Sequence, residues 1–181
     1  VVLYSNYPIE DLHKKKIGLS NSSKTSVFLL KILLKLYYEI DPTYINVDHA
    51  YHLNTIDAQL VIGNDALKET VQVPYIYDLG ELWLKKTSYP VVFAIFAVQK
   101  EFANNNSYLI NKIINSFVKS LQIYKNNKSS VIEAAKMKYK SVNYNIENYY
   151  SLIKYEFTDD LKEALLFFYH KASELHLLPD I

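Results

Sequence analysis

The sequence predicts an α/β fold, and two observations support this prediction. Up to about Val98, short apolar runs with strand character alternate with one long helical pattern, and all three glycines fall in this part. Beyond Val98, the apolar residues follow helical spacing only. Alternating strands and helices are typical of an open α/β sheet, in which ligands lie beyond the carboxyl ends of the strands.

Six strands and one helix are predicted in the first part of the chain. The helix is predicted over Lys24 to Tyr38, where apolar residues recur at every third or fourth position. The strands are short apolar runs, with Pro42, Pro74 and Pro90 between or beside them. They are predicted at Val1–Ser5, Lys16–Leu19, Tyr44–Val47, Ala58–Ile62, Tyr75–Asp78 and Val91–Ala97.

The second part is predicted to be helical. One helix is expected over Lys100 to Lys125, with Asn104 to Asn106 marking a loop or a helix edge, and Ser129 or Ser130 is expected to cap a helix that runs through Met137. Asp160 and Glu163 have the spacing of a capping box for the terminal helix. The core-facing residues of that helix are predicted to be Leu161, Ala164, Leu165, Phe168, Tyr169, Ala172 and Leu175.

Composition narrows the classes of function. With 50% hydrophobic residues among 181, the chain can form a core of its own. A net charge of +1 gives no reason to expect nucleic acid as a partner, and the absence of cysteine excludes disulfides and thiolate metal sites. All 20 basic residues are lysine, so a carboxylate ligand would be held by ammonium groups, hydroxyls and backbone N–H groups. The longest apolar stretch, Val91–Val98, is far shorter than the roughly 20 residues that span a bilayer.

A hydroxyl-rich turn lies between the predicted strand Lys16–Leu19 and the predicted helix. Its candidate binding residues are Ser20, Ser22, Ser23, Lys24, Thr25 and Ser26. The first N–H groups of a helix have no partner within it and carry the positive end of the helix dipole, which favours a bound anion. The alternative is that one of these hydroxyls simply caps the helix. Capping needs one hydroxyl and the turn supplies five, and this surplus favours an anion site.

A second candidate turn follows the apolar run Leu60 to Ile62. Gly63 permits close approach of the backbone to a ligand, and Asn64 can both donate and accept hydrogen bonds. Asp65 is expected to cap the short helical turn that follows. A third segment, Tyr77 to Trp83, ends another strand, and its tryptophan is expected to lie in the core.

The histidines do not indicate a metal site. His49 and His52, beside Asp48, have a spacing that could recruit a metal if they lay on a helix facing Asp57, but two exposed loop histidines are the simpler interpretation. His170 and His176 are expected on the outer or end surfaces of the terminal helix. We therefore expect no bound metal. The sequence contains no nucleophile triad, Walker loop or dinucleotide-binding glycine motif.

Four segments together resemble the chorismate dehydratases of the futalosine route to menaquinone, the MqnA/MqnD family. They are IGLSNSSKTSVFLLKILL at 17–34, AQLVIGNDAL at 58–67, YDLGELWLKKTSYPVVFAIFA at 77–97, and YYSLIKYEFTDDLKEALLFFYHKASELHLLPD at 149–180. Each segment alone is a modest signal, but the order and the combination are specific.

The resemblance implies a type II periplasmic-binding-protein-like fold with two lobes and the ligand between them. Residues 9–90 would form the second lobe, and residues 1–8 and 91–181 the remnant of a first lobe that is incomplete in this chain. Val1–Asn6 and Val91–Ala97 would cross between the lobes. The implied function is a cytoplasmic carbon-oxygen lyase that converts chorismate to 3-enolpyruvylbenzoate and water without a cofactor. Its partner would be this small dicarboxylate, with no nucleic acid and no membrane.

The resemblance also implies where the active site lies. The family's catalytic asparagine and serine would fall upstream of Val1, so no catalytic residue can be named, and we expect residues 1–181 alone to be inactive. Substrate binding would fall to the hydroxyl-rich turn with Gly63 and Asn64. The chain departs from the family pattern at Lys24, where an arginine is usual, and at Asn64, where an aspartate is usual.

Three alternatives stay open at this point. One is the sister enzyme that cleaves a cyclic futalosine derivative and resembles this fold. That enzyme has a histidine at the position of Gly63, so the glycine argues against this alternative. Another is a solute-binding protein for small carboxylates, and the third is a catalytically silent relative.

Overall fold

The computed structural model describes residues 1–47, 53–68 and 71–179, and they form two compact units. The first unit contains residues 1–93 and 156–181, and the second contains residues 94–155. The predicted lobe boundaries stay a prediction. Within the described ranges, no helix combines the length and the apolar character needed to cross a membrane.

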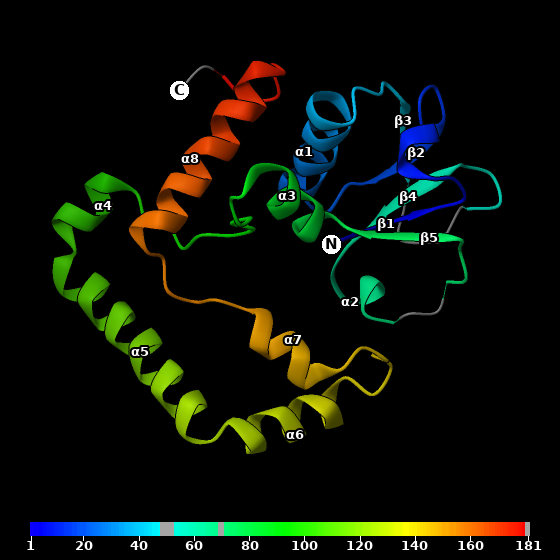
Figure 1. The fold of residues 1–181 in the computed structure, drawn as a ribbon. Helices are drawn as coiled ribbons and strands as arrows, with labels where there is room; N and C mark the ends of the chain where they lie inside the picture. The colour runs from blue at the N-terminus through cyan, green and yellow to red at the C-terminus, as the bar shows by residue number, and fades with distance from the viewer. Residues whose placement is uncertain (48–52, 69–70, 180–181) are drawn as a thin grey trace. The chain divides into compact units, whose positions relative to one another are not determined.

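The first unit contains a mixed sheet of five strands in the order β3-β2-β4-β1-β5 (Figure 1). β2 pairs in parallel with β3 and β4, whereas β1 pairs antiparallel with β4 and β5. β1 therefore runs opposite to all the others. The strands are β1 Val2–Ser5, β2 Lys16–Ser20, β3 Thr43–Val47, β4 Ala58–Val61 and β5 Tyr75–Asp78. These bounds confirm five of the six predicted strands to within one residue at either end.

The sixth predicted strand, Val91–Ala97, is wrong. Residues 89–99 form no regular secondary structure. The run has the aromatic and β-branched composition of a strand, but composition supplies no hydrogen-bonding partner. A strand is stable only when a neighbour satisfies its backbone groups, and no described strand pairs with this run. Val91 and Val92 are half-buried, but the apolar side chains from Phe93 to Ala97 are exposed, with Phe96 at 75%.

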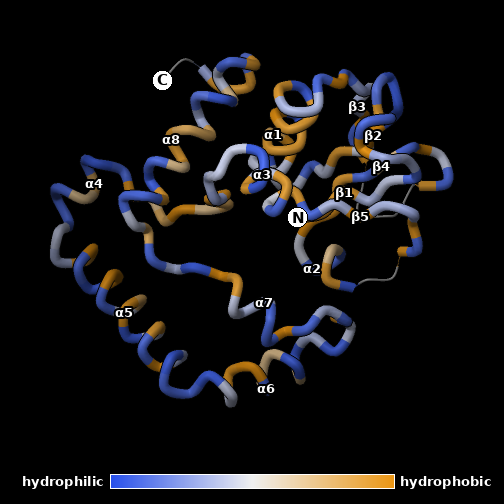
Figure 2. Tube along the Cα trace, viewed as in Figure 1, coloured by the Kyte–Doolittle hydropathy of each residue, from blue (hydrophilic) through white to orange (hydrophobic). Residues whose placement is uncertain are grey.

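Helices α1 (Lys24–Ile32), α2 (Gly63–Ala66), α3 (Leu79–Thr87) and α8 (Asp159–Glu174) complete the first unit, together with a short 3-10 turn at Ile9–Asp11. α1 continues as a π-helix over Leu33–Tyr37, so the predicted helix Lys24–Tyr38 is confirmed but changes its hydrogen bonding midway. α1 packs against α3 and α8. Its residues after the first turn are mainly apolar (Figure 2).

The core of the first unit forms between these helices and the sheet. Trp83 of α3 is fully buried, as predicted, and its ring contacts Tyr37, Phe167 and Phe168 edge-on at centroid distances of 5.6 to 6.0 Å. Leu30 of α1 is also fully buried. The predicted core face of α8 is confirmed, because Ala164, Phe168 and Ala172 are buried and the other four members are half-buried.

The second unit is helical, as predicted. It contains α4 (Lys100–Asn105), α5 (Ser107–Asn126), α6 (Lys128–Lys138) and α7 (Ile146–Leu152). Asn106 interrupts the helix predicted over Lys100 to Lys125, where a loop or helix edge was expected. The only buried residues of these helices are Ile132 and Ala135 of α6, and no residue of α5 is buried. A ring contact of 5.0 Å joins Phe96 to Phe117 of α5.

Two predicted helix caps are wrong. α6 begins directly after α5, so Asn127 is the N-cap and Ser129 and Ser130 lie inside the first turn. α8 begins at Asp159 after Thr158, which places Asp160 in the first turn, and no side chain caps this helix. In the first turn of α8, the negative charge of Asp160 interacts favourably with the positive end of the helix dipole, without forming a capping hydrogen bond. Glu163 instead accepts a hydrogen bond of 3.0 Å from the Tyr89 hydroxyl.

Candidate functional site

The hydroxyl-rich turn connects the end of β2 at Ser20 to the start of α1 at Lys24. Ser23 is the N-cap of α1, with extended backbone angles (φ −148°, ψ 105°). Its Oγ accepts the Ser26 N–H at 3.2 Å and lies 2.9 Å from the Ser26 Oγ. Ser20 accepts the Ser22 N–H at 3.2 Å. The turn therefore caps its helix with one serine and folds on itself through another.

The six predicted binding residues of this turn differ in how far their side chains are exposed. Ser26 is only 3% exposed, and its hydroxyl lies against the Ser23 cap. Ser20, Ser23 and Thr25 are half-buried, whereas Ser22 and Lys24 are exposed. The first N–H groups of α1, at Lys24 and Thr25, have no partner within the helix. The groups that can meet a ligand are thus these two N–H groups and the hydroxyls outside the Ser26 position.

The second predicted turn begins α2 directly after β4. Gly63 has φ +61°, in the left-handed region that glycine adopts at little cost, and a Cβ at this position would have no atom within 4 Å. The space beside Gly63 is therefore open, and Asn64 next to it is exposed. The prediction that Asp65 caps α2 is wrong, because Asp65 lies inside the helix and forms an ion pair of 2.7 Å with Lys68.

Sheet topology brings the two turns to one edge. β2 and β4 are parallel neighbours, with Ile17 opposite Ala58 and Gly18 opposite Gln59. The same register continued by two residues sets Ser20, the last residue of β2, level with Val61, the last residue of β4. Because adjacent strands lie roughly 4.8 Å apart, the turns that follow them are neighbours. The α1 N-terminus and the Gly63 turn therefore lie at the same edge of the sheet.

Asp78 lies at the same edge, in a capping role that was not among the sequence predictions. β1 pairs Val2 with both Val61 and Asp78, which fixes the end of β5 beside the start of β1. The Asp78 Oδ1 accepts the N–H groups of Gly80 at 2.8 Å and Glu81 at 3.0 Å, so Asp78 caps α3. The sequence does contain a signal for this cap, because Asp78 followed three residues later by Glu81 is a capping-box pattern.

The caps of α1 and α3 differ in charge, which decides where an anion is stabilised. The N-terminus of α3 already holds the carboxylate of Asp78, which neutralises the positive end of its dipole. The N-terminus of α1 is capped by a neutral hydroxyl, and no acidic residue lies in its first turn. Of these two helix ends, α1 is therefore the one that favours an additional negative charge.

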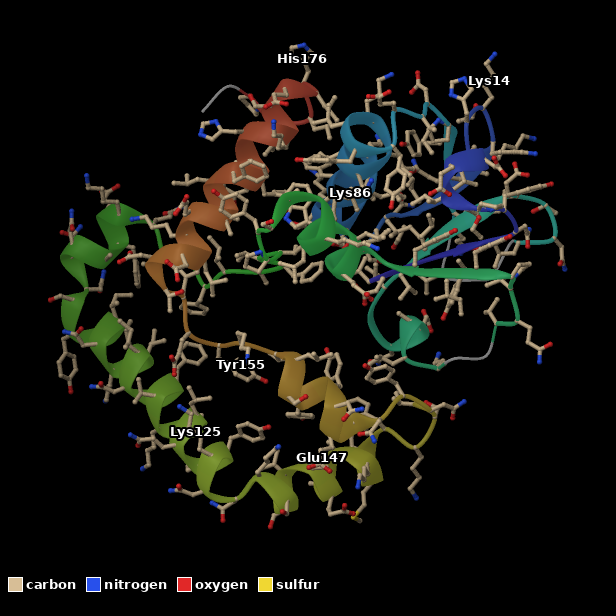
Figure 3. All side chains as sticks on the ribbon, viewed as in Figure 1. Lys14, Lys86, Lys125, Glu147, Tyr155 and His176 are labelled. Carbon is tan, nitrogen blue, oxygen red and sulfur yellow. The ribbon has the colours of Figure 1, made fainter. Side chains whose placement is uncertain are left out.

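Several tyrosines of the first unit remain protonated at neutral pH. Burial raises the pKa of Tyr44 in β3 well above its ordinary value, and the Lys31 Nζ lies 5.0 Å from its ring centroid. Burial also raises the pKa of Tyr77, whose hydroxyl accepts the Ile9 N–H at 2.9 Å. Lys86, labelled in Figure 3, has its Nζ 4.4 Å from the ring centroid of Tyr38, and burial raises the pKa of that phenol too. These groups pack the first unit and do not act as bases near pH 7.

Among residues 1–47, 53–68 and 71–179, the histidines and carboxylates do not gather into a metal centre. In the part of the chain that the structure describes, no group of three or more His, Asp or Glu side chains could hold a metal ion. The possible H-x-x-H pair, His49 and His52 with Asp48, lies outside the described residues. His170 and His176 are exposed, and His176 points outward beyond the end of α8 (Figure 3).

Comparisons with known proteins bear on the family of this chain. A family model described as menaquinone biosynthesis matches residues 1–174. A chorismate dehydratase of Thermus thermophilus is 32% identical over 107 residues, a match that covers 49% of this chain and 39% of the relative. The chain thus matches about two fifths of that protein's length. Because the family model extends over nearly the whole chain, the protein belongs to the menaquinone biosynthesis family.

Proposed function

We propose that this protein binds chorismate and takes part in its dehydration to 3-enolpyruvylbenzoate and water, as a carbon-oxygen lyase of the cytoplasm. Membership of the menaquinone biosynthesis family supports the pathway, and the printed name of the Thermus relative supports the substrate. The observation that carries the proposal is the placement of the hydroxyl-rich turn and the Gly63 turn at one edge of the sheet.

The proposed site binds a dicarboxylate through two neighbouring turns. One carboxylate would lie at the N-terminus of α1, held by the N–H groups of Lys24 and Thr25 and by the Thr25 hydroxyl. Ser26 would act through Ser23, because the two hydroxyls are 2.9 Å apart and Ser26 is buried. Asn64 would bind the far end of the ligand over the open space beside Gly63. Ser20 and Ser22 would supply further hydroxyls, and Lys24 a counter-charge.

The proposed reaction suits such a site. Chorismate carries two carboxylates and a ring hydroxyl, and loss of that hydroxyl with a ring proton as water makes the ring aromatic. A reaction with this driving force needs a fixed substrate and stabilised charge more than a strong nucleophile. The residues named here would supply binding and positioning. We assign the proton transfer to none of them.

We also propose that the chain has the two-lobed architecture of type II periplasmic binding proteins, with residues 9–90 as one lobe and residues 1–8 and 91–181 as part of the other. The direction of β1 supports this. A strand from the start of the chain, inserted antiparallel among four strands from residues 16–78, is what a segment entering from another lobe would form.

The proposal is tested by chorismate turnover and binding. The complete gene product is incubated with chorismate, and 3-enolpyruvylbenzoate is detected by mass. The variant Thr25→Ala with Ser26→Ala should raise the KM for chorismate at least tenfold or abolish turnover. The matched control is Ser129→Ala with Ser130→Ala, which removes two exposed hydroxyls from the first turn of α6 and should leave the KM unchanged. Unchanged kinetics in the Thr25 and Ser26 variant would refute the site, and a lack of product from the unaltered protein would refute the reaction.

A further inference from the structure

We draw no further inference here: the strongest candidate, the exposed apolar face of α5 around Ile114, Phe117 and Val118, carries nothing because nothing in the structure shows what covers it.

Discussion

Ser23 allows helix capping and anion binding to be measured separately. Its Oγ accepts the Ser26 N–H, and Ser23→Ala removes this bond and leaves a helix donor unsatisfied. Loss of a serine N-cap costs about 1 kcal/mol of folding stability. Ser23→Asp keeps an acceptor at the same position, since aspartate caps as well as serine, so its free energy of unfolding should stay close to that of the unaltered protein.

Binding should respond differently to the two substitutions. A carboxylate ligand at the α1 N-terminus would lie about 5 Å from the carboxylate that Ser23→Asp introduces, where like charges repel by about 0.8 kcal/mol in water and about 3 kcal/mol at an effective dielectric of about 20. Ser23→Asp should therefore weaken chorismate binding roughly 4- to 150-fold while the protein stays folded. Ser23→Ala should lower folding stability. It should weaken chorismate binding only as far as the Ser23 hydroxyl itself contributes to binding.

The assay pairs urea unfolding with calorimetric titration of chorismate. The control is Ser129→Asp, which places the same charge in the first turn of α6 and should change chorismate affinity little. A Ser23→Asp protein that unfolds normally and binds chorismate with unaltered affinity would show that no anion sits at this turn. A Ser23→Ala protein of unaltered stability would instead refute the capping role.

Three further predictions concern the fold and the second turn. Gly63→Ala should cost about 1 kcal/mol of folding stability. The positive φ alone causes this loss, because a Cβ at this position meets no atom within 4 Å. A loss of several kcal/mol in urea unfolding would show that the space beside Gly63 is not open. Burial raises the pKa of Tyr44, so its neutral form stabilises the fold fully below about pH 10, and this contribution is lost as pH rises above the pKa of the unfolded phenol. At about pH 11 the loss of folding stability is at most about 1.4 kcal/mol for this one group. The Tyr44→Phe variant should therefore lose correspondingly less stability between about pH 8 and pH 11 than the unaltered protein. Equal losses would contradict the raised pKa of Tyr44. Leu30→Ala, at a fully buried position, should lower the free energy of unfolding by about 2 to 5 kcal/mol. Phe117→Ala, at a position 55% exposed, should lower it by less than about 1 kcal/mol. Similar losses at the two sites would mean that α5 is packed as tightly as α1.

Local sequence was a good guide where an element's own residues determine its structure. The helix from Lys24 and the break at Asn106 follow from periodicity and from side chains that compete with the backbone, which act within a few residues. Prediction failed where the outcome depends on neighbours. Val91–Ala97 has strand composition but no described strand to pair with, and Ser129 lost the capping position because α5 extends to Asn126.

For the candidate site, the sequence alone determined which residues are candidates for binding a ligand. Five hydroxyls at a strand-to-helix junction, and a glycine and an asparagine after another strand, are properties of short segments, and the four quoted motifs carry the family. Only the tertiary structure decided that these two turns are neighbours, because the pairing of β2 with β4 joins residues about 40 positions apart. It also decided that Ser26 is buried behind Ser23 and that Asp78 already occupies the α3 N-terminus. The physical reason is that side-chain chemistry is local, whereas burial, strand register and the charge facing a helix end are set by contacts between distant parts of the chain.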